Sequence, residues 1–143
     1  MKIKLALLAD YANVTTDGKL NILGIFDRIH VAKLPAVHPQ MQFVIRIEAH
    51  PAEAGRNHRL EVRLHDPDGQ TVFNIQGDMM VQSRGPGEII YTNQIITINN
   101  LQLPKTGGYT FIVFTDNDLK AEVPLLVERA KEQRGANVEE EAD

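Results

Sequence analysis

Residues 58–76 read HRLEVRLHDPDGQTVFNIQ, and this stretch decides the fold. From His58 to His65 apolar side chains alternate with polar ones, which is the pattern of a β-strand with one buried face. A tight turn should follow, because Pro67 fixes its own φ near the value that a turn needs and Gly69 tolerates positive φ. Apolar residues return directly after the turn, so the stretch predicts an antiparallel β-hairpin.

The rest of the chain carries similar signals. About eight short strands separated by turn residues predict an all-β fold, a two-sheet antiparallel β-sandwich with an immunoglobulin-like Greek key. No helical periodicity of useful length interrupts the pattern before residue 128. The further strands are expected at residues 2–11, 20–31, 41–48, 88–99, 109–114 and 119–127.

Three of these strands carry more detailed expectations. The odd-numbered residues from Ile3 to Tyr11 are apolar and should share the buried face of the first strand. The apolar phase of the second strand changes near Gly24, which indicates a bulge or a close backbone approach. Strand 88–99 is apolar on both faces, so either both faces are covered or the strand bulges near Asn93.

Two connections between strands can also be predicted. Pro35 and Pro39 cannot donate hydrogen bonds to a β-ladder, so residues 32–40 should form a crossing loop. Residues 49–57 should form a second connection that contains one helical turn.

The segment Leu103-Pro-Lys-Thr-Gly-Gly-Tyr109 resembles a tyrosine corner, in which a Tyr hydroxyl bonds back to upstream backbone. The alternative is that Tyr109 is an ordinary half-buried aromatic residue. If the corner forms, 109–114 is the penultimate strand, and the hairpin 58–76 shares a sheet with the last hairpin. Tyr11 and Tyr91 also lie on apolar parities, so all three tyrosines are expected in the core.

Length and composition indicate one domain with a charged tail. The chain has 143 residues, 43% of them hydrophobic, which is enough for a core in residues 1–127. Residues 128–143 carry too little apolar surface to offset their ordering entropy, so this acidic tail is expected to be disordered.

Composition also limits location and partners. The apolar run from Leu5 to Ala9 is shorter than the roughly 7–15 residues of an export signal, and no run approaches the ~20 residues of a membrane span. We therefore expect a cytoplasmic protein with no membrane partner. The net charge is −4 and the 15 basic residues are scattered, which argues against a nucleic-acid partner.

The residues that usually carry catalysis do not form a known pattern. There is no cysteine, and the single serine, Ser83, lacks the Gly-x-Ser-x-Gly context of a nucleophile elbow. No two of the five histidines have the i, i+2 or i, i+4 spacing that favours metal binding, and His58 and His65 should face opposite sides of their sheet. We expect no enzymatic activity and no cofactor.

Two turns carry paired carboxylates that could bind a cation. Asp66 and Asp68 lie in one predicted turn, and Asp116 and Asp118 lie in another. Ca²⁺ requires six to eight oxygen ligands at one place, whereas the two turns should project from opposite ends of the same sheet. Local turn formation is the favoured role for all four residues, and a ligand- or Ca²⁺-binding sandwich is the alternative hypothesis.

One predicted strand has too many apolar residues for a solvent-facing side. Tyr109, Phe111 and Val113 should face the core, and this leaves Ile112 and Phe114 on the outer face. This face could be covered by the first strand, by the segment around Met79 and Met80, or by another subunit. The sequence therefore predicts a protein-interaction or assembly module, either self-associating or bound to a protein partner. Its candidate interaction face consists of Ile112, Phe114, Met79 and Met80.

Several segments also resemble a known family when they are taken in order. They are LLADYA and LNILGIFDRI near the start, HRLEVRL with DPDG in the central hairpin, and LPKTGGY before the penultimate strand. Over roughly residues 5–127 the chain is similar to a family of small bacterial proteins known only as an uncharacterised domain. The resemblance implies a β-sandwich and a bacterial source, and it supplies neither an activity nor functional residues.

Overall fold

The computed structural model of the chain describes residues 1–130, which form nine β-strands and one short 3₁₀ turn. The elements are β1 (Lys2–Val14), β2 (Leu20–Phe26), β3 (Arg28–Val31), β4 (Ala36–Ala49), η1 (Pro51–Glu53), β5 (Asn57–His65), β6 (Thr71–Met80), β7 (Ile90–Leu103), β8 (Gly107–Thr115) and β9 (Asp118–Arg129).

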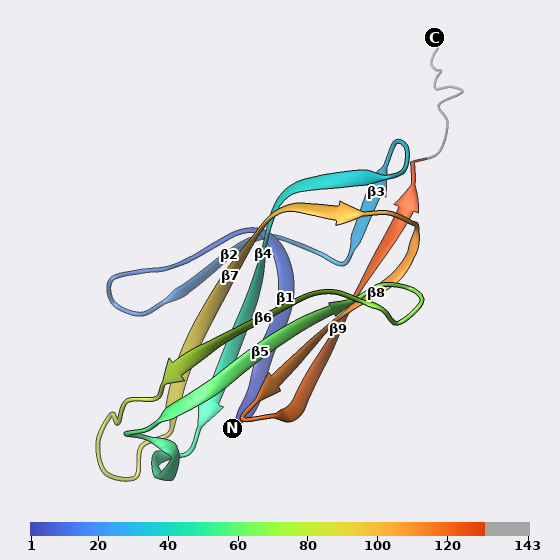
Figure 1. Ribbon diagram of the computed structural model, residues 1–143. Coiled ribbons are helices and arrows are strands. Elements are labelled where there is room, and N and C mark those ends of the chain that lie inside the picture. Colours follow the sequence, from blue (N-terminus) through green and yellow to red (C-terminus); the bar gives the residue numbers. More distant parts are fainter. Residues whose placement is uncertain (131–143) are drawn as a thin grey trace.

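The strands form two sheets that pack face to face (Figure 1). One sheet has four strands in the order β2-β1-β4-β7, and the other has five in the order β3-β9-β8-β5-β6. The predicted hairpin 58–76 is formed by β5 and β6, and β5 pairs with β8 of the last hairpin, as expected. The all-β, two-sheet class predicted from the alternating pattern is thus confirmed.

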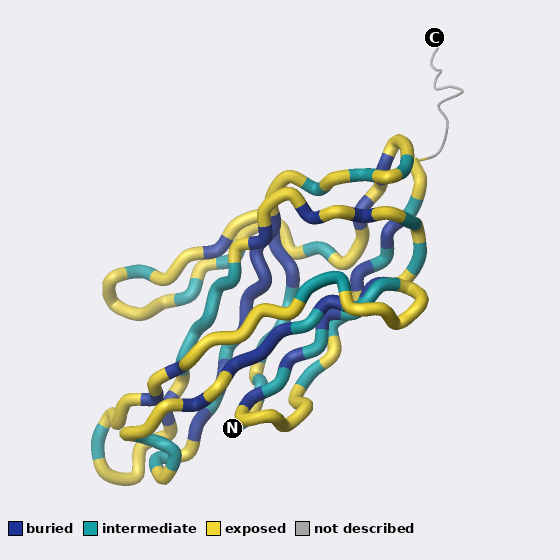
Figure 2. The backbone as a smooth tube through the Cα atoms, viewed as in Figure 1, coloured by how far each residue is buried: buried dark blue, intermediate teal, exposed yellow. Residues whose placement is uncertain are grey.

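The main core lies between the two sheets, where the buried stretches of both layers face each other (Figure 2). The inward residues of β4 are those predicted from its alternation, and Phe43 among them stacks on Phe111 of β8 with ring centroids 4.9 Å apart. Tyr109 is fully buried, and its hydroxyl donates to the carbonyl oxygen of Lys105 across 2.7 Å. The tyrosine corner is therefore present.

The prediction for the face of β1 is wrong. The register of β1 against β4 shifts between Ile3 and Leu5, and this irregularity places the even-numbered Leu8 in the core. Leu5 is only half-buried, and Tyr11 is 48% exposed. A single extra residue exchanges the two faces of a strand, and apolar alternation alone does not reveal where that residue lies.

The predicted strand 20–31 is two strands in different sheets. β2 pairs with β1, whereas β3 crosses to the other sheet and runs parallel to β9. The β1–β2 register shows no shift around Gly24, so the predicted bulge is wrong, but a close approach does occur there. Gly24 has φ of 73°, and a Cβ at this position would lie 2.5 Å from Oδ2 of Asp10.

The connection around the first two prolines is shorter than predicted. β4 already begins at Ala36, so Pro39 lies inside a strand. This is tolerated because β1 pairs with β4 only from Gln42 onward, which leaves one edge of β4 free at Pro39. The second connection contains the predicted helical turn, which is η1.

β7 is the edge strand of the four-stranded sheet, and its pairing with β4 keeps one register throughout. The predicted bulge near Asn93 is therefore wrong. The alternative of two covered faces holds only in part, because Ile95 on the outer face is half-buried whereas Tyr91 is 40% exposed. Polar pairs link the outer faces of the two strands, namely Gln40 with Asn99, Gln42 with Thr97 and Arg46 with Asn93.

The last strand extends two residues past the predicted domain end. Glu128 and Arg129 belong to β9 and pair with β3, so this strand ends two residues later than its predicted end at residue 127. The disorder predicted for the tail concerns mainly residues 131–143, which lie outside the described part of the chain. Within residues 1–130, no helix is long and apolar enough to cross a membrane.

Candidate functional site

The hairpin of β1 and β2 forms an arm, residues 10–26, that extends to one side of the sandwich (Figure 1). The backbone N–H of Ala12 on this arm donates to Oε1 of Gln42 on the outer face of β4 across 2.5 Å. Ala9 and Val44 are fully buried although neither belongs to the core between the sheets. The arm thus covers part of a sheet face that a sandwich normally leaves to solvent.

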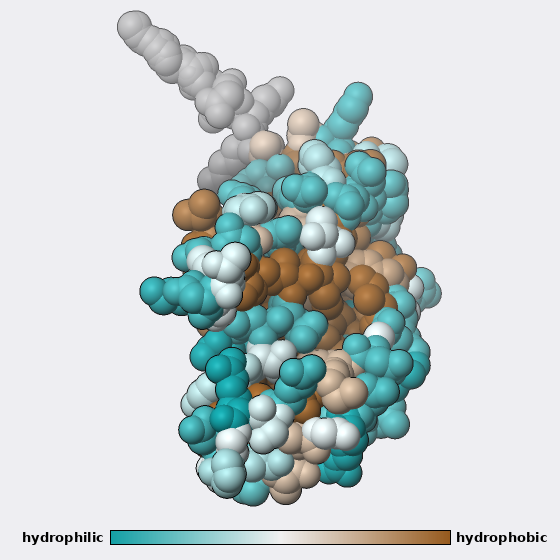
Figure 3. Space-filling view, turned by 90° about the vertical axis from the view of Figure 1, so that its left-hand side faces the viewer, coloured by the Kyte–Doolittle hydropathy of each residue, from teal (hydrophilic) through white to brown (hydrophobic). Residues whose placement is uncertain are grey.

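A cleft of about 440 Å³, which we call the arm cleft, opens beside the tip of the arm. Val14 of the arm lines one wall, Arg84 and Glu88 of the β6–β7 loop line another, and Arg46 and Tyr91 lie on β4 and β7 between them. Figure 3 looks at the side of the molecule on which the arm and this loop lie, and it shows a band of hydrophobic side chains bordered by polar ones. The cleft therefore combines charged groups with nearby apolar surface.

Arg46 is held in place by two contacts. Its guanidinium carbon lies 4.6 Å from the centre of the Tyr91 ring, and its Nη1 donates to Oδ1 of Asn93 across 2.9 Å. Among the described residues, neither Arg46 nor Arg84 forms a salt bridge. The cleft thus contains an oriented, half-buried cation without a carboxylate partner.

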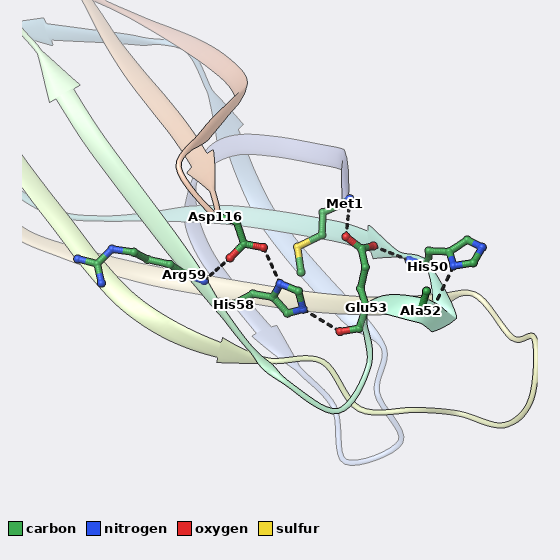
Figure 4. A network of polar contacts seen from close by, with 7 residues as sticks. All are labelled: Met1, His50, Ala52, Glu53, His58, Arg59 and Asp116. Atoms are coloured by element: carbon green, nitrogen blue, oxygen red, sulfur yellow. Dashed lines mark hydrogen bonds and ion pairs between the residues drawn. The ribbon is translucent and has the colours of Figure 1, made fainter.

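A second polar cluster joins three distant segments at the end of the sandwich near the N-terminus (Figure 4). His58 of β5 is 4% exposed and shares the inward parity of Leu60. Its Nδ1 lies 2.6 Å from Oδ2 of Asp116 in the β8–β9 turn, and its Nε2 lies 2.7 Å from the carbonyl oxygen of Glu53 in η1. We call this cluster the His58 network.

The partners of His58 favour its charged form. Burial by itself would lower the pKa of His58, but the hydrogen bonds to Asp116 and to the Glu53 carbonyl outweigh it, so the pKa of His58 is raised above its usual 6.5. Burial would likewise raise the pKa of Asp116, but the hydrogen bonds from His58 and from the Arg59 N–H lower it. Both ring nitrogens are occupied, so His58 has no free nitrogen to act as a general base.

The network extends to the N-terminus of the described chain. The Met1 ammonium donates to Oε2 of Glu53 across 3.0 Å, and the His50 N–H donates to Oε1 across 2.8 Å. Burial would raise the pKa of Glu53, but these two bonds lower it. The cluster thus stabilises the junction of β1, η1, β5 and the β8–β9 turn, which is a structural role.

The paired carboxylates predicted from sequence lie at opposite ends of the five-stranded sheet, as expected from the antiparallel register of β5 and β8. Oδ1 of Asp66 accepts the N–H groups of Asp68 and Gln70, each across 2.9 Å, and this is the local turn role that was favoured. The Nζ of Lys105 bonds to Asp68 and lies 3.8 Å from Oδ2 of Asp66.

At the other end of the sheet, Asp116 belongs to the His58 network, whereas Asp118 is exposed at the start of β9. Nowhere in residues 1–130 do three or more His, Cys, Asp or Glu side chains gather in a group that could hold a metal ion. Three of the four candidate carboxylates thus bond within the protein: Asp66 and Asp68 contact Lys105 and turn N–H groups, and Asp116 contacts His58 and the Arg59 N–H.

The predicted interaction face is divided by the structure. Ile112 and Phe114 do lie on the outer face of β8 and are half-buried, because the guanidinium of Arg63 lies 4.5 Å from the centre of the Phe114 ring. Met80 is 50% exposed, but Met79 is 4% exposed and packs in the main core. The prediction that Met79 belongs to the interaction face is therefore wrong, because Met79 points inward and its neighbour Met80 points outward.

Sequence reasoning missed both polar sites. The signal for His58 was available, because it shares the parity of the buried apolar residues of β5. Nothing in the sequence connects Arg46 with Arg84. Arg46 lies on β4 and Arg84 on the β6–β7 loop, and the two line one cleft only after folding. Tyr91 was predicted to be in the core because its neighbours are isoleucines.

The two-sheet fold with its tyrosine corner defines an all-β domain. The model of the Family of unknown function (DUF6941) matches residues 4–128, and the chain belongs to this family. The family expected from the sequence segments is thereby confirmed as one without a known activity. No curated protein matches the chain.

Proposed function

We propose that the protein is a non-enzymatic interaction module that self-associates through the free edge of β7. The observation that carries this proposal is the composition of that edge: β7 runs for 14 residues with no charged residue, proline or glycine. Its register against β4 has no bulge, and within residues 1–130 no further strand pairs with its other side. Unpaired backbone groups on such an edge are a template for another strand.

The other three edges are protected in ways that β7 is not. β3 has only four residues, and its Arg28 and His30 are charged or polar. β2 is interrupted by Gly24 at positive φ, and β6 contains Gly77 and Asp78. Short length, charges and backbone irregularities all disfavour edge-to-edge pairing. Only Asn100, at φ of 54°, interrupts β7, and it lies near the end of the strand.

A second copy of the chain is the partner that best fits this edge. Each chain carries a net charge of −4, but β7 contributes none of it, so two β7 strands can approach without repulsion. In an antiparallel pair with its axis at Ile95, Asn93 of one copy would lie opposite Thr97 of the second copy. The same register places Tyr91 opposite Asn99, so polar outer-face residues meet polar or amphipathic ones.

Exposed apolar side chains near this edge support an interface. Tyr91 is 40% exposed at the start of β7, and Ile89 just before it is 44% exposed. Large apolar side chains gathered on one side of a molecule are typical of interaction surfaces, and the band in Figure 3 is consistent with this interpretation. The face of Ile112 and Phe114 is a weaker candidate, because Arg63 already lies over Phe114.

The finer fold assignment, an immunoglobulin-like Greek key, is part of the same proposal. It is supported by the tyrosine corner at Tyr109 in the penultimate strand and by the shared sheet of the β5–β6 and β8–β9 hairpins.

The alternative hypothesis is a ligand- or Ca²⁺-binding sandwich that uses its end loops. The contacts of the candidate carboxylates favour it less, because Lys105 already pairs with Asp68 and His58 binds Asp116. Titration with CaCl₂ in a thermal-shift assay tests this alternative, since a bound ion must raise Tm with concentration.

Sedimentation equilibrium tests the self-association. The proposal predicts a mass that rises toward two chains by about 1 mM, where an association free energy of about 4 kcal/mol becomes visible. Thr97→Lys places two like charges at the paired edge and should keep the protein at the mass of one chain. Thr71→Lys, another exposed position on a sheet edge, is the control for the added charge and should associate like the wild type. A wild-type mass of one chain at every concentration would show that the proposal is wrong.

A further inference from the structure

We propose that the arm cleft binds an oxyanion, a carboxylate or phosphate group, carried on a small molecule with a flat apolar part. This inference goes beyond self-association, because it rests on the two arginines of the cleft; Tyr91 and Asn93 belong both to the cleft and to the proposed β7 interface. A volume of about 440 Å³ is within the range of small-molecule sites, which is about 300–1,000 Å³.

Arg46 supplies the anchoring cation. A guanidinium has five N–H donors, and the structure assigns one of them to Asn93. The contact with the Tyr91 ring and the bond to Asn93 restrain the side chain, so less entropy is lost when an anion binds. Because Arg46 is half-buried, its charge is less screened by water than that of a fully exposed arginine.

Arg84 supplies a second cation, from the wall of the cleft that the β6–β7 loop forms. It is exposed on the β6–β7 loop and lines both the arm cleft and a neighbouring hollow of about 420 Å³. A guanidinium group can bind a carboxylate or phosphate through two parallel N–H bonds, and a second one at the same cleft adds to the attraction. The cleft thus offers two donors that are separated by 38 positions in the sequence, 84 − 46.

The electrostatics of the cleft differ from those of the whole chain. The protein has a net charge of −4, whereas the cleft is lined by two arginines and one carboxylate, Glu88, which gives +2 − 1 = +1. A locally positive hollow on an acidic protein concentrates anions at that place. Glu88 should disfavour ligands that carry several negative charges.

The apolar lining specifies the rest of the ligand. The Tyr91 ring, Ile89 and Val14 line the same cleft as the arginines. A flat apolar group can lie against these side chains while its oxyanion contacts Arg46. The class that fits is therefore a small aromatic or unsaturated acid, or a phosphate ester of similar size.

The test is an NMR titration of the ¹⁵N-labelled full-length chain carrying Thr97→Lys, so that self-association does not change with ligand. Sodium benzoate and inorganic phosphate are the two probes, and they separate a carboxylate on a flat body from a bare phosphate. The proposal predicts saturable shifts at the Nε–H of Arg46 and at the amides of Tyr91 and Asn93 with at least one probe.

Variants distinguish the cleft from general anion attraction. Arg84→Gln, at an exposed position that should not affect folding, is expected to weaken binding about tenfold, which corresponds to about 1.4 kcal/mol. Arg46→Lys retains the charge but loses the planar fork, and it should weaken binding by a similar factor. Arg129→Gln, an equal change of charge on β9, should bind like the parent chain. Unsaturable shifts with both probes, or equal losses in all three variants, would overturn the proposal.

Discussion

The His58 network should make the stability of the protein depend on pH, and Asp116→Asn isolates its cause. Asp116 has φ of 49°, a conformation that Asn adopts more readily than most residues, so the turn should be kept. The amide oxygen can still accept the Arg59 N–H, which now bonds to Oδ1 across 2.9 Å. Only the negative charge beside Nδ1 of His58 is lost.

The loss of stability expected from Asp116→Asn follows from the bond between His58 and Asp116. A hydrogen bond between charged groups contributes about 1.5–3 kcal/mol, but the Asp116 side chain is 47% exposed and solvent screening reduces the value to about 1–1.5 kcal/mol. For a domain of this size, that loss lowers Tm by about 3–6 °C at pH 6.

The sign of the pH dependence follows from the raised pKa of His58. The stabilisation is complete below the unfolded pKa of about 6.5 and is lost as the pH rises through the higher folded pKa. Deprotonation must break one bond, because a neutral imidazole cannot donate to Asp116 and to the Glu53 carbonyl at once. Asp116→Asn should abolish this loss, since its amide N–H can donate to a neutral Nδ1.

The measurement is the free energy of unfolding by urea at several pH values from 6 to 9. The wild type should lose stability across this range relative to Asp116→Asn, and the two curves should converge toward high pH. Below pH 5 the lowered pKa values of Asp116 and Glu53 act in the opposite direction, so the wild type should lose stability there as these carboxylates are protonated. Parallel curves from pH 6 to 9 would refute the assignment of a charged His58.

Two further predictions test the core. Tyr109→Phe removes the bond to the Lys105 carbonyl and should lower the free energy of unfolding by about 1–2 kcal/mol in urea, whereas Tyr11→Phe, at an exposed ring, should change it by less than about 0.5 kcal/mol. Met79→Ala should cost about 2–5 kcal/mol because it leaves a cavity, and Met80→Ala should cost less than about 0.5 kcal/mol; equal losses for the two would contradict the phase of β6.

The parts of the fold that the sequence predicted are those set by local chemistry. Alternation identified the inward face of β4, and the segment before Tyr109 identified the tyrosine corner. Each of these two signals is contained within a few consecutive residues of the chain. The errors lie where one residue changes the phase, as at Leu5, or where a strand changes sheets, as between β2 and β3.

The candidate site was not predictable for a different reason. Arg46 and Tyr91 face solvent on regular strands, and each looks ordinary in its own segment. They become a site only because the arm and the β6–β7 loop border the same sheet face. Gly24 lies at the base of the arm, where a Cβ would lie 2.5 Å from Oδ2 of Asp10.

The fold error at β2 and the missed cleft both concern the hairpin of β1 and β2. A strand that stayed in one sheet from residue 20 to 31 would lie flat beside β1. The chain instead crosses to the other sheet after Phe26. The outer part of the β1–β2 hairpin extends as the arm, which contacts β4 through the bond from Ala12 to Gln42. Positive φ at Gly24 permits the close contact with Asp10 at the base of the arm. The crossing that strand prediction missed thus ends the arm at its base, and Val14 and Gly18 of the arm line one wall of the cleft.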